Sequence, residues 1–137
     1  MKGSLAVLFA LTSASALAAQ DAATPAPDTA STQKRCLDLV RIEQTEVLDN
    51  KHIVFHVSGQ GGPMYLNTLP HACVGLTKTD PILYQTSLSE LCDLDMITVL
   101  HQQGAGFMRG ASCGLGKFES VTKEQVEMLK RAEHPTP

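Results

Sequence analysis

The sequence predicts a small, mainly β domain that is stapled by disulfides and closed by one short C-terminal helix. Between residues 37 and 118, short runs rich in β-branched and aromatic residues are separated by Gly, Pro, Asn and Asp, which is typical of an antiparallel meander. Four cysteines lie in the same stretch. A helical apolar period follows only after residue 122. We therefore expect a curled sheet or a small open barrel with helix as the minor element.

The first two expected strands form a hairpin. Residues 37–49 show an imperfect period of two, and the turn residues "DNK" lead into "HIVFHV" at 52–57. In that second run Ile53, Phe55 and Val57 share one face, while His52, Val54 and His56 lie on the other. Further strands are expected at 64–69, at 82–87, at 94–100 and near 117–118, with a glycine loop at 104–116 between the last two.

Two helix starts are indicated by capping residues. The segment Ser87 to Glu90 fits a capping box over a single helical turn. Thr122 with Gln125 three residues later predicts the N-terminus of a C-terminal helix in "TKEQVEMLKRA".

The N-terminus has the pattern of a secretory signal peptide. Lys2 precedes an uncharged apolar run from Leu5 to about Ala18. This run is shorter than the roughly 20 residues of a membrane-spanning helix, and it ends in the small-x-small pattern Ala16-Leu17-Ala18. We expect cleavage after Ala18, export to the periplasm, and a mature chain without a transmembrane segment.

The chain is expected to contain three parts. Residues 1–18 are the signal peptide. Residues 19–35, "AQDAATPAPDTASTQKR", hold no large apolar side chain that could offset the entropy of ordering, so they are expected to form a flexible Ala/Thr/Pro tether. Residues 36–134 remain for one small β-rich domain.

The charge of the chain argues against nucleic acid as a partner. Removing residues 1–18 takes Lys2 from the 11 basic residues and leaves all 14 acidic ones, a net charge of about −4. A nucleic-acid binder is expected to carry a clustered basic stripe, and here Lys and Arg are scattered.

The four cysteines are interpreted as two disulfides, because exported chains fold in an oxidising compartment. Three pairings are possible. Two arms of the chain look loosely alike, each running from a cysteine through a strand and a Gly-rich turn to "CVGL" or "CGLG". If this likeness is real, each arm closes on itself, with Cys36 bonded to Cys73 and Cys92 to Cys113.

The motif "GASCGLGKF" raises the alternative that Cys113 is a catalytic thiol. A reactive cysteine needs a nearby histidine, a cation or a helix N-terminus, and the residues after Cys113 have no helical period. A phosphate loop is excluded because the Gly-Lys-Ser/Thr ending is missing. A disulfide in a turn is the favoured interpretation.

Metal binding by copper or zinc is a second alternative. His52 and His56 lie on one face of a strand but about 13 Å apart, so each would need ligands from another element. No His-x-His or Cys-x-x-Cys pair occurs. The candidate ligands are His52, His56, His71 and His101, with Met64 or Met108 as soft ligands.

Acid-base or serine chemistry has weaker signals. Asp93 and Asp95 are two residues apart at the start of an expected strand, where solvated turn residues are common, and no Gly-x-Ser-x-Gly elbow is present. We expect neither a catalytic site nor a cofactor.

The segments "YLNTLPHACVGL", "YQTSLSELCDLDMITVL" and "GASCGLGKF" resemble the signature blocks of a family of small exported proteobacterial proteins, defined as a domain of unknown function. The resemblance covers about Cys36 to Phe118 and includes all four cysteines. It implies an exported, cysteine-bearing domain and brings no catalytic residues with it.

The expected function is therefore a non-catalytic binding or interaction module, whose partner is a protein or another envelope component. The segment "QQGAGFMRGAS" is the expected binding surface, because Phe107, Met108 and Arg109 are of types enriched in interface cores. The alternative is that Phe107 and Met108 fold back as a lid over the small core.

Overall fold

The computed structural model describes residues 32–133. The predicted signal peptide, most of the predicted tether and His134 lie outside the described residues. The elements in chain order are β1 (Gln33–Lys34), β2 (Cys36–Asp38), the 3-10 turn η1 (Leu39–Arg41), β3 (Ile42–Val47), β4 (His52–Val57), β5 (Met64–Thr68), β6 (Ile82–Gln85), β7 (Glu90–Cys92), β8 (Met96–Gln103), β9 (Gly106–Gly114), β10 (Phe118–Val121) and α1 (Lys123–Glu133). The mainly β class with one short C-terminal helix is confirmed.

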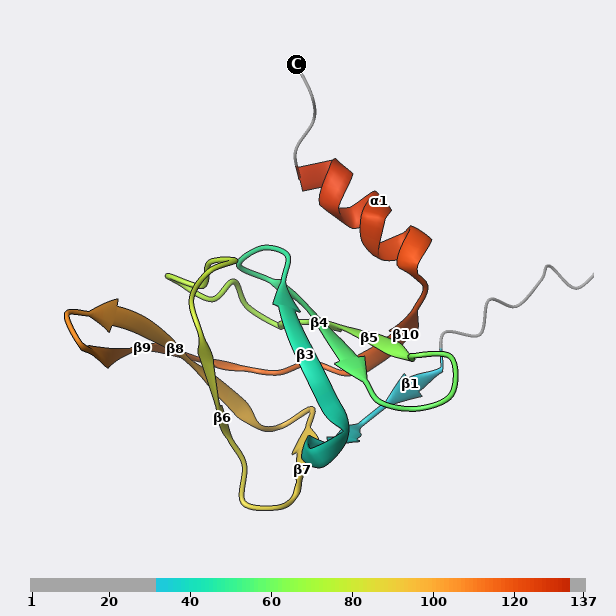
Figure 1. Cartoon of the computed structure of the whole chain (residues 1–137), viewed down its shortest axis with the longest axis horizontal. Coiled ribbons are helices and arrows are strands. Elements are labelled where there is room, and N and C mark those ends of the chain that lie inside the picture. Colours follow the sequence, from blue (N-terminus) through green and yellow to red (C-terminus); the bar gives the residue numbers. More distant parts are fainter. Residues whose placement is uncertain (1–31, 134–137) are drawn as a thin grey trace, which may run out of the picture.

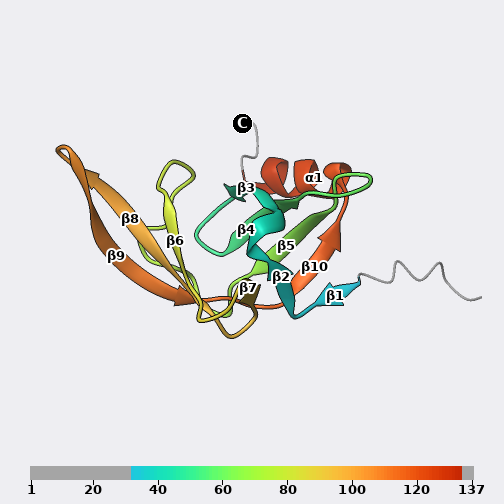
Figure 2. The same ribbon diagram turned by 60° about the horizontal axis from the view of Figure 1, so that its bottom comes forward.

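The strands form three antiparallel sheets. The largest has the order β1-β10-β5-β4-β3, a second contains β6-β8-β9, and β2 pairs with β7 alone. Within residues 32–133 no sheet closes or curls on itself, so the narrower expectation of a curled sheet or open barrel is wrong. The β8–β9 hairpin extends well beyond the other strands (Figures 1 and 2).

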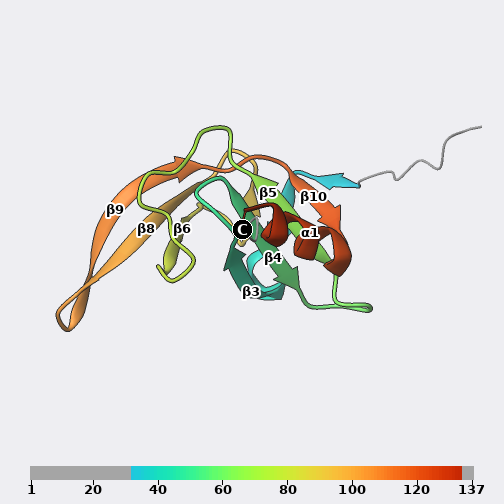
Figure 3. The ribbon, with the colours of Figure 1, turned by 90° about the horizontal axis from the view of Figure 1, so that it is seen from above.

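The five-stranded sheet is covered on both faces. Helix α1 lies along one face (Figures 2 and 3), where Val54 of β4 shares a buried cluster with Val126 of the helix. On the opposite face Ile53 and Phe55 belong to the main core, which also contains Ile97 of β8. The predicted alternation of "HIVFHV" is therefore confirmed, because its two faces enter two different clusters.

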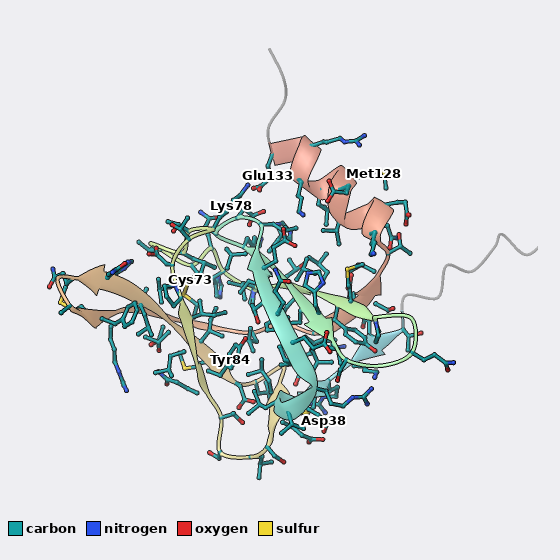
Figure 4. All side chains as sticks on the ribbon, in the orientation of Figure 1. Asp38, Cys73, Lys78, Tyr84, Met128 and Glu133 are labelled. Atoms are coloured by element: carbon teal, nitrogen blue, oxygen red, sulfur yellow. A yellow bond between two sulfur atoms is a disulfide. The ribbon has the colours of Figure 1, made fainter. Side chains whose placement is uncertain are left out.

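Phe55 lies at the centre of the main core. Its ring centroid is 5.4 Å from that of Phe118 in an edge-to-face arrangement and 6.3 Å from that of Tyr84, spacings at which aromatic pairs attract. Tyr84 (labelled in Figure 4) belongs to β6, and its hydroxyl is hydrogen-bonded to that of Thr45 on β3. Burial raises the pKa of the Tyr84 phenol despite this hydrogen bond. Phe55 thus joins the five-stranded and the three-stranded sheets.

The two disulfides join Cys36 to Cys92 and Cys73 to Cys113. The pairing of each arm with itself is wrong, because β2 pairs with β7 and the loop after β5 lies beside β9. The bonds span 56 and 40 residues of chain, and closing loops of this length contributes about 4 kcal/mol each in the chain-entropy account.

The motif "GASCGLGKF" contains a backbone clamp. The buried side chain of Asn67 donates from Nδ2 to the Gly116 carbonyl at 2.6 Å and accepts from the Gly116 N–H at 2.9 Å. A Cβ on residue 116 would lie 2.2 Å from the carbonyl oxygen of Thr68, so only glycine fits there. The amide of Asn67 thus binds β5 to the segment between β9 and β10.

The largest differences from the sequence-based expectation concern four segments. The predicted glycine loop at 104–116 is mostly strand β9, and the long strand at 37–49 is interrupted by η1. Ser87 to Glu90 forms no helical turn; the Thr86 hydroxyl donates to the Glu90 carbonyl at 2.7 Å instead, at the start of β7. The end of the predicted tether, Gln33–Lys34, pairs with β10.

The capping box of α1 is confirmed. The Thr122 N–H donates to the Gln125 side chain at 2.8 Å, and the Gln125 N–H donates to the Thr122 hydroxyl at 3.3 Å. Both hydrogen bonds satisfy backbone donors that a helix start leaves unpaired. The predicted helix therefore begins where its capping residues indicate.

Replacing Asn67 with alanine is expected to destabilise the fold by about 2–4 kcal/mol, because the half-buried N–H and C=O of Gly116 both lose their partner and the fully buried Asn67 side chain is truncated. The free energy of unfolding from urea titration measures this. The matched control is Asn50→Ala, an exposed asparagine, which is expected to change stability by less than about 1 kcal/mol. Equal effects of the two substitutions would contradict the clamp.

Candidate functional site

The projecting β8–β9 hairpin presents the residues that the sequence analysis selected for binding. Its strands are joined at Gly104, whose φ of +59° suits glycine. Phe107 and Met108 are 62% and 49% exposed. The alternative that these two side chains fold back over the core is therefore wrong.

Two rows of side chains run along one face of the three-stranded sheet, here called the outer hairpin face, and they are exposed near the hairpin tip but buried at Thr98. Phe107 lies opposite Gln102 and Arg109 opposite Leu100 in the strand register. Closer to the domain, the hydroxyls of Thr98 and Ser112 are 2.7 Å apart and hydrogen-bonded. The outer hairpin face comprises Leu83, Gln85, Met96, Thr98, Leu100, Gln102, Phe107, Arg109 and Ser112.

Strand β9 leaves one of its edges free. It is the last strand of the sheet order β6-β8-β9, so no strand among residues 32–133 pairs with its other side. The Leu115 N–H donates to the Asp95 carbonyl on the β8 side at 2.9 Å. Because backbone groups alternate in an antiparallel ladder, those of Ser112 and Gly114 point toward the free edge.

A mainly apolar pocket of about 280 Å³ lies along this free edge. One wall is β9 itself, and the other is the loop after β5 that Cys73 ties to Cys113 (Figure 4 labels Cys73). Val74 on that loop is 81% exposed. The lining residues are Pro70, His71, Ala72, Val74, Ala111, Ser112, Cys113 and Gly114.

His101, toward the far end of β8, lies close to two glycines, Gly75 and Gly110. A Cβ on Gly110 would lie 2.5 Å from its Nε2, and one on Gly75 would lie 3.3 Å from its Cε1. On the other side of the ring, Nδ1 is 3.6 Å from a carboxylate oxygen of Asp80. The glycines thus make room for the imidazole, a role that no spacing in the sequence indicates.

The four candidate histidine ligands are not brought together. His52 Nδ1 is 2.5 Å from Asp49 and His56 Nε2 is 3.4 Å from Glu46, whereas His71 lines the pocket. Of the proposed sulfur ligands, Met64 is buried and Met108 exposed. Among residues 32–133, three potential ligands meet only at Cys36, Glu90 and Cys92, and there the two sulfurs form a disulfide.

The residues considered for catalysis have structural partners. Cys113 is bonded to Cys73, so the described domain offers no free thiol there. Asp93 forms an ion pair with Arg35 at 3.2 Å, and Asp95 accepts the Cys92 N–H at 2.7 Å. These carboxylates stabilise the turn after β7 and do not converge on a cleft.

No family model, curated protein or solved structure matches this chain. The resemblance to an exported family therefore stays a prediction from the quoted segments. The two disulfides indicate an oxidising compartment outside the cytoplasm. Within residues 32–133, no helix has the length and apolar character needed to cross a membrane.

The charged groups away from the hairpin hold α1 on its sheet. Lys130 on the helix is 2.7 Å from Glu46 on β3 and 3.1 Å from Glu127. Burial disfavours ionisation of Glu46, but hydrogen bonds from Lys130 and His56 outweigh it and lower the pKa of that carboxyl. At the far end of the helix, Glu133 is 3.8 Å from Lys78 (Figure 4).

The lowered pKa of Glu46 makes the seating of α1 sensitive to acid. A carboxyl whose pKa is depressed on folding stabilises the fold above its ordinary value of 4.5 and loses that contribution as pH falls through the lower, folded-state value. Urea unfolding at pH 3 to 7 is expected to show a smaller acid loss of stability in Glu46→Gln than in the wild type.

Glu43→Gln is the matched control, because Glu43 lies exposed on the same strand. Its loss of unfolding free energy between pH 7 and pH 3 is expected to equal that of the wild type. If Glu46→Gln behaves like this control, the ion pairs with α1 contribute nothing to stability.

Proposed function

We propose that this protein is a non-catalytic binding module of the periplasm, which takes up an extended, acidic segment of a partner protein along the free edge of β9. The observation that carries the proposal is the combination of a free strand edge with a pocket directly beside it. The disulfides and the predicted signal peptide support the compartment.

Strand addition is the recognition mode that suits this geometry. In that mode, main-chain hydrogen bonds provide affinity and pockets for alternate side chains provide specificity. Ser112 and Gly114 supply unpaired backbone groups at the edge, and both line the apolar pocket. An added strand would place a small or medium apolar side chain there.

The length of β9 also favours a partner. Proteins usually protect exposed edges by keeping them short or by adding charges, bulges or proline. Strand β9 has nine residues, carries Arg109 as its one charged side chain and exposes Phe107 and Met108. The register shift between Thr98 and Leu100 in the β8–β9 pairing is the main feature that protects the edge of β9 from pairing with other strands.

Charge selects an acidic occupant over a second copy of the chain. Residues 96–118 contain no Asp or Glu, whereas Arg109 and Lys117 lie in this segment. Pairing β9 with β9 of another molecule would bring two basic hairpins together. An acidic residue on the added strand would instead be attracted to Arg109.

A library of displayed nine-residue peptides tests the proposal. Enriched peptides are expected to combine an apolar residue with Asp or Glu, and on binding to slow amide hydrogen exchange at Ser112 and Gly114. Arg109→Glu is expected to weaken these peptides at least about tenfold and to bind charge-swapped peptides carrying Lys more tightly.

Arg131→Glu on the exposed side of α1 is the matched control and is expected to leave peptide binding unchanged. Absence of any enriched peptide would refute strand addition. Binding that ignores Arg109 would refute the acidic partner. A concentration-dependent dimer in sedimentation, abolished by Phe107→Ala, would assign the edge to a second copy instead.

A further inference from the structure

The two disulfides occupy different settings. Cys36 and Cys92 lie directly opposite each other in the β2–β7 ladder. On one side of this pair the Asp93 N–H donates to the Arg35 carbonyl at 2.8 Å. On the other side, at the end of the ladder, the Leu39 N–H donates to the Ser89 carbonyl at 2.9 Å. Because hydrogen-bonded and non-hydrogen-bonded pairs alternate, Cys36 and Cys92 form a non-hydrogen-bonded pair, in which the strands are closest.

The backbone spacing at this bond is unusually short. The Cα atoms of Cys36 and Cys92 are 4.0 Å apart, whereas those of Cys73 and Cys113 are 5.7 Å apart. Disulfides normally span 4.4–6.8 Å between Cα atoms, and bonds outside that range are more easily reduced. The second bond lies well inside the range.

Cys36–Cys92 is also more exposed to solvent than Cys73–Cys113. Cys36 and Cys92 are both partly exposed, whereas in the second bond Cys113 is partly exposed and Cys73 is fully buried. Figure 4 places Asp38, two residues after Cys36, at the end of the molecule away from α1. Exposed disulfides are the ones that typically undergo exchange with thiols.

We propose that Cys36–Cys92 is a redox-exchange site for a dithiol reductant, and that Cys73–Cys113 is a permanent structural bond. A thiolate of the reductant attacks one sulfur and forms a mixed disulfide with it, and the Cys36–Cys92 S–S bond breaks. The other cysteine leaves as a thiolate and takes a proton from water. The second thiol of the reductant then displaces the first cysteine, so two electrons pass to the protein and the reductant becomes a disulfide.

The surrounding charges select among reductants. A carboxylate oxygen of Glu90 lies within 4.8 Å of both sulfurs, and Asp38 lies opposite Glu90 in the ladder. Negative charge at this distance repels an approaching anionic thiol and attracts a cationic one. The site therefore favours reductants whose thiol lies beside positive or neutral groups.

Reduction would free a small part of the fold. Strands β2 and β7 have three residues each, and an isolated two-stranded pair is marginally stable. Leu37 and Leu91 lie opposite each other in the same ladder, and both are buried in the main core. Breaking the disulfide would let these two leucines become exposed.

Partial reduction of the native protein tests the site without any substitution. The protein is treated with dithiothreitol, alkylated at intervals and mapped by mass spectrometry. We expect Cys36 and Cys92 to be alkylated at least tenfold faster than Cys73 and Cys113. Equal rates, or earlier reduction of Cys73–Cys113, would overturn the proposal.

The charge selection has its own test with two small monothiols. Cysteamine, which is cationic, is expected to react with Cys36–Cys92 several-fold faster per thiolate than anionic mercaptoacetate. This ratio should fall in Glu90→Gln and stay unchanged in Glu127→Gln, a control on the remote helix. An unchanged ratio in Glu90→Gln would refute selection by charge.

Discussion

The packing of Phe55 against an aromatic ring from each of two other strands is the interaction on which the domain depends. The three sheets share no continuous hydrogen-bond ladder, so they must be joined by side chains. Phe55 meets Phe118 of its own sheet and Tyr84 of the three-stranded sheet. Cys73–Cys113 and the Asn67–Gly116 clamp reinforce the same junction at its periphery. The hairpin can project because its base is held at these points.

Features encoded by neighbouring residues could be predicted from the sequence. The two faces of "HIVFHV" and the capping box at Thr122 depend on local spacing alone, and both occur in the structure. Strand β9 could not be predicted, because "GFMRGASCG" holds three glycines and its β structure depends on pairing with β8. The prediction of a helical turn at Ser87 was wrong because the Thr86 side chain forms hydrogen bonds with nearby backbone groups instead.

The disulfide pairing and the pocket depend on contacts that no local pattern records. Cys36 bonds to Cys92 because β2 pairs with β7, which lies more than 50 residues later in the chain. The pocket exists because Cys73 holds the loop after β5 beside β9. Residue types did indicate that Phe107, Met108 and Arg109 lie on an exposed surface. The free edge of β9 and the pocket beside it suggest how that surface binds, but both could be identified only from the three-dimensional structure.

The placement of the two disulfides lets binding and redox exchange operate separately. Cys73–Cys113 ties the two walls of the pocket along β9 together, so its reduction would loosen the proposed binding edge. Cys36–Cys92 lies in the separate β2–β7 pair. If it alone is exchanged, the hairpin keeps both its structural disulfide and the Asn67 clamp. A reductant acting at the β2–β7 pair would then expose Leu37 and Leu91, which belong to the same buried cluster as Phe55. The binding edge would still be held by Cys73–Cys113 and by the pairing of β9 with β8.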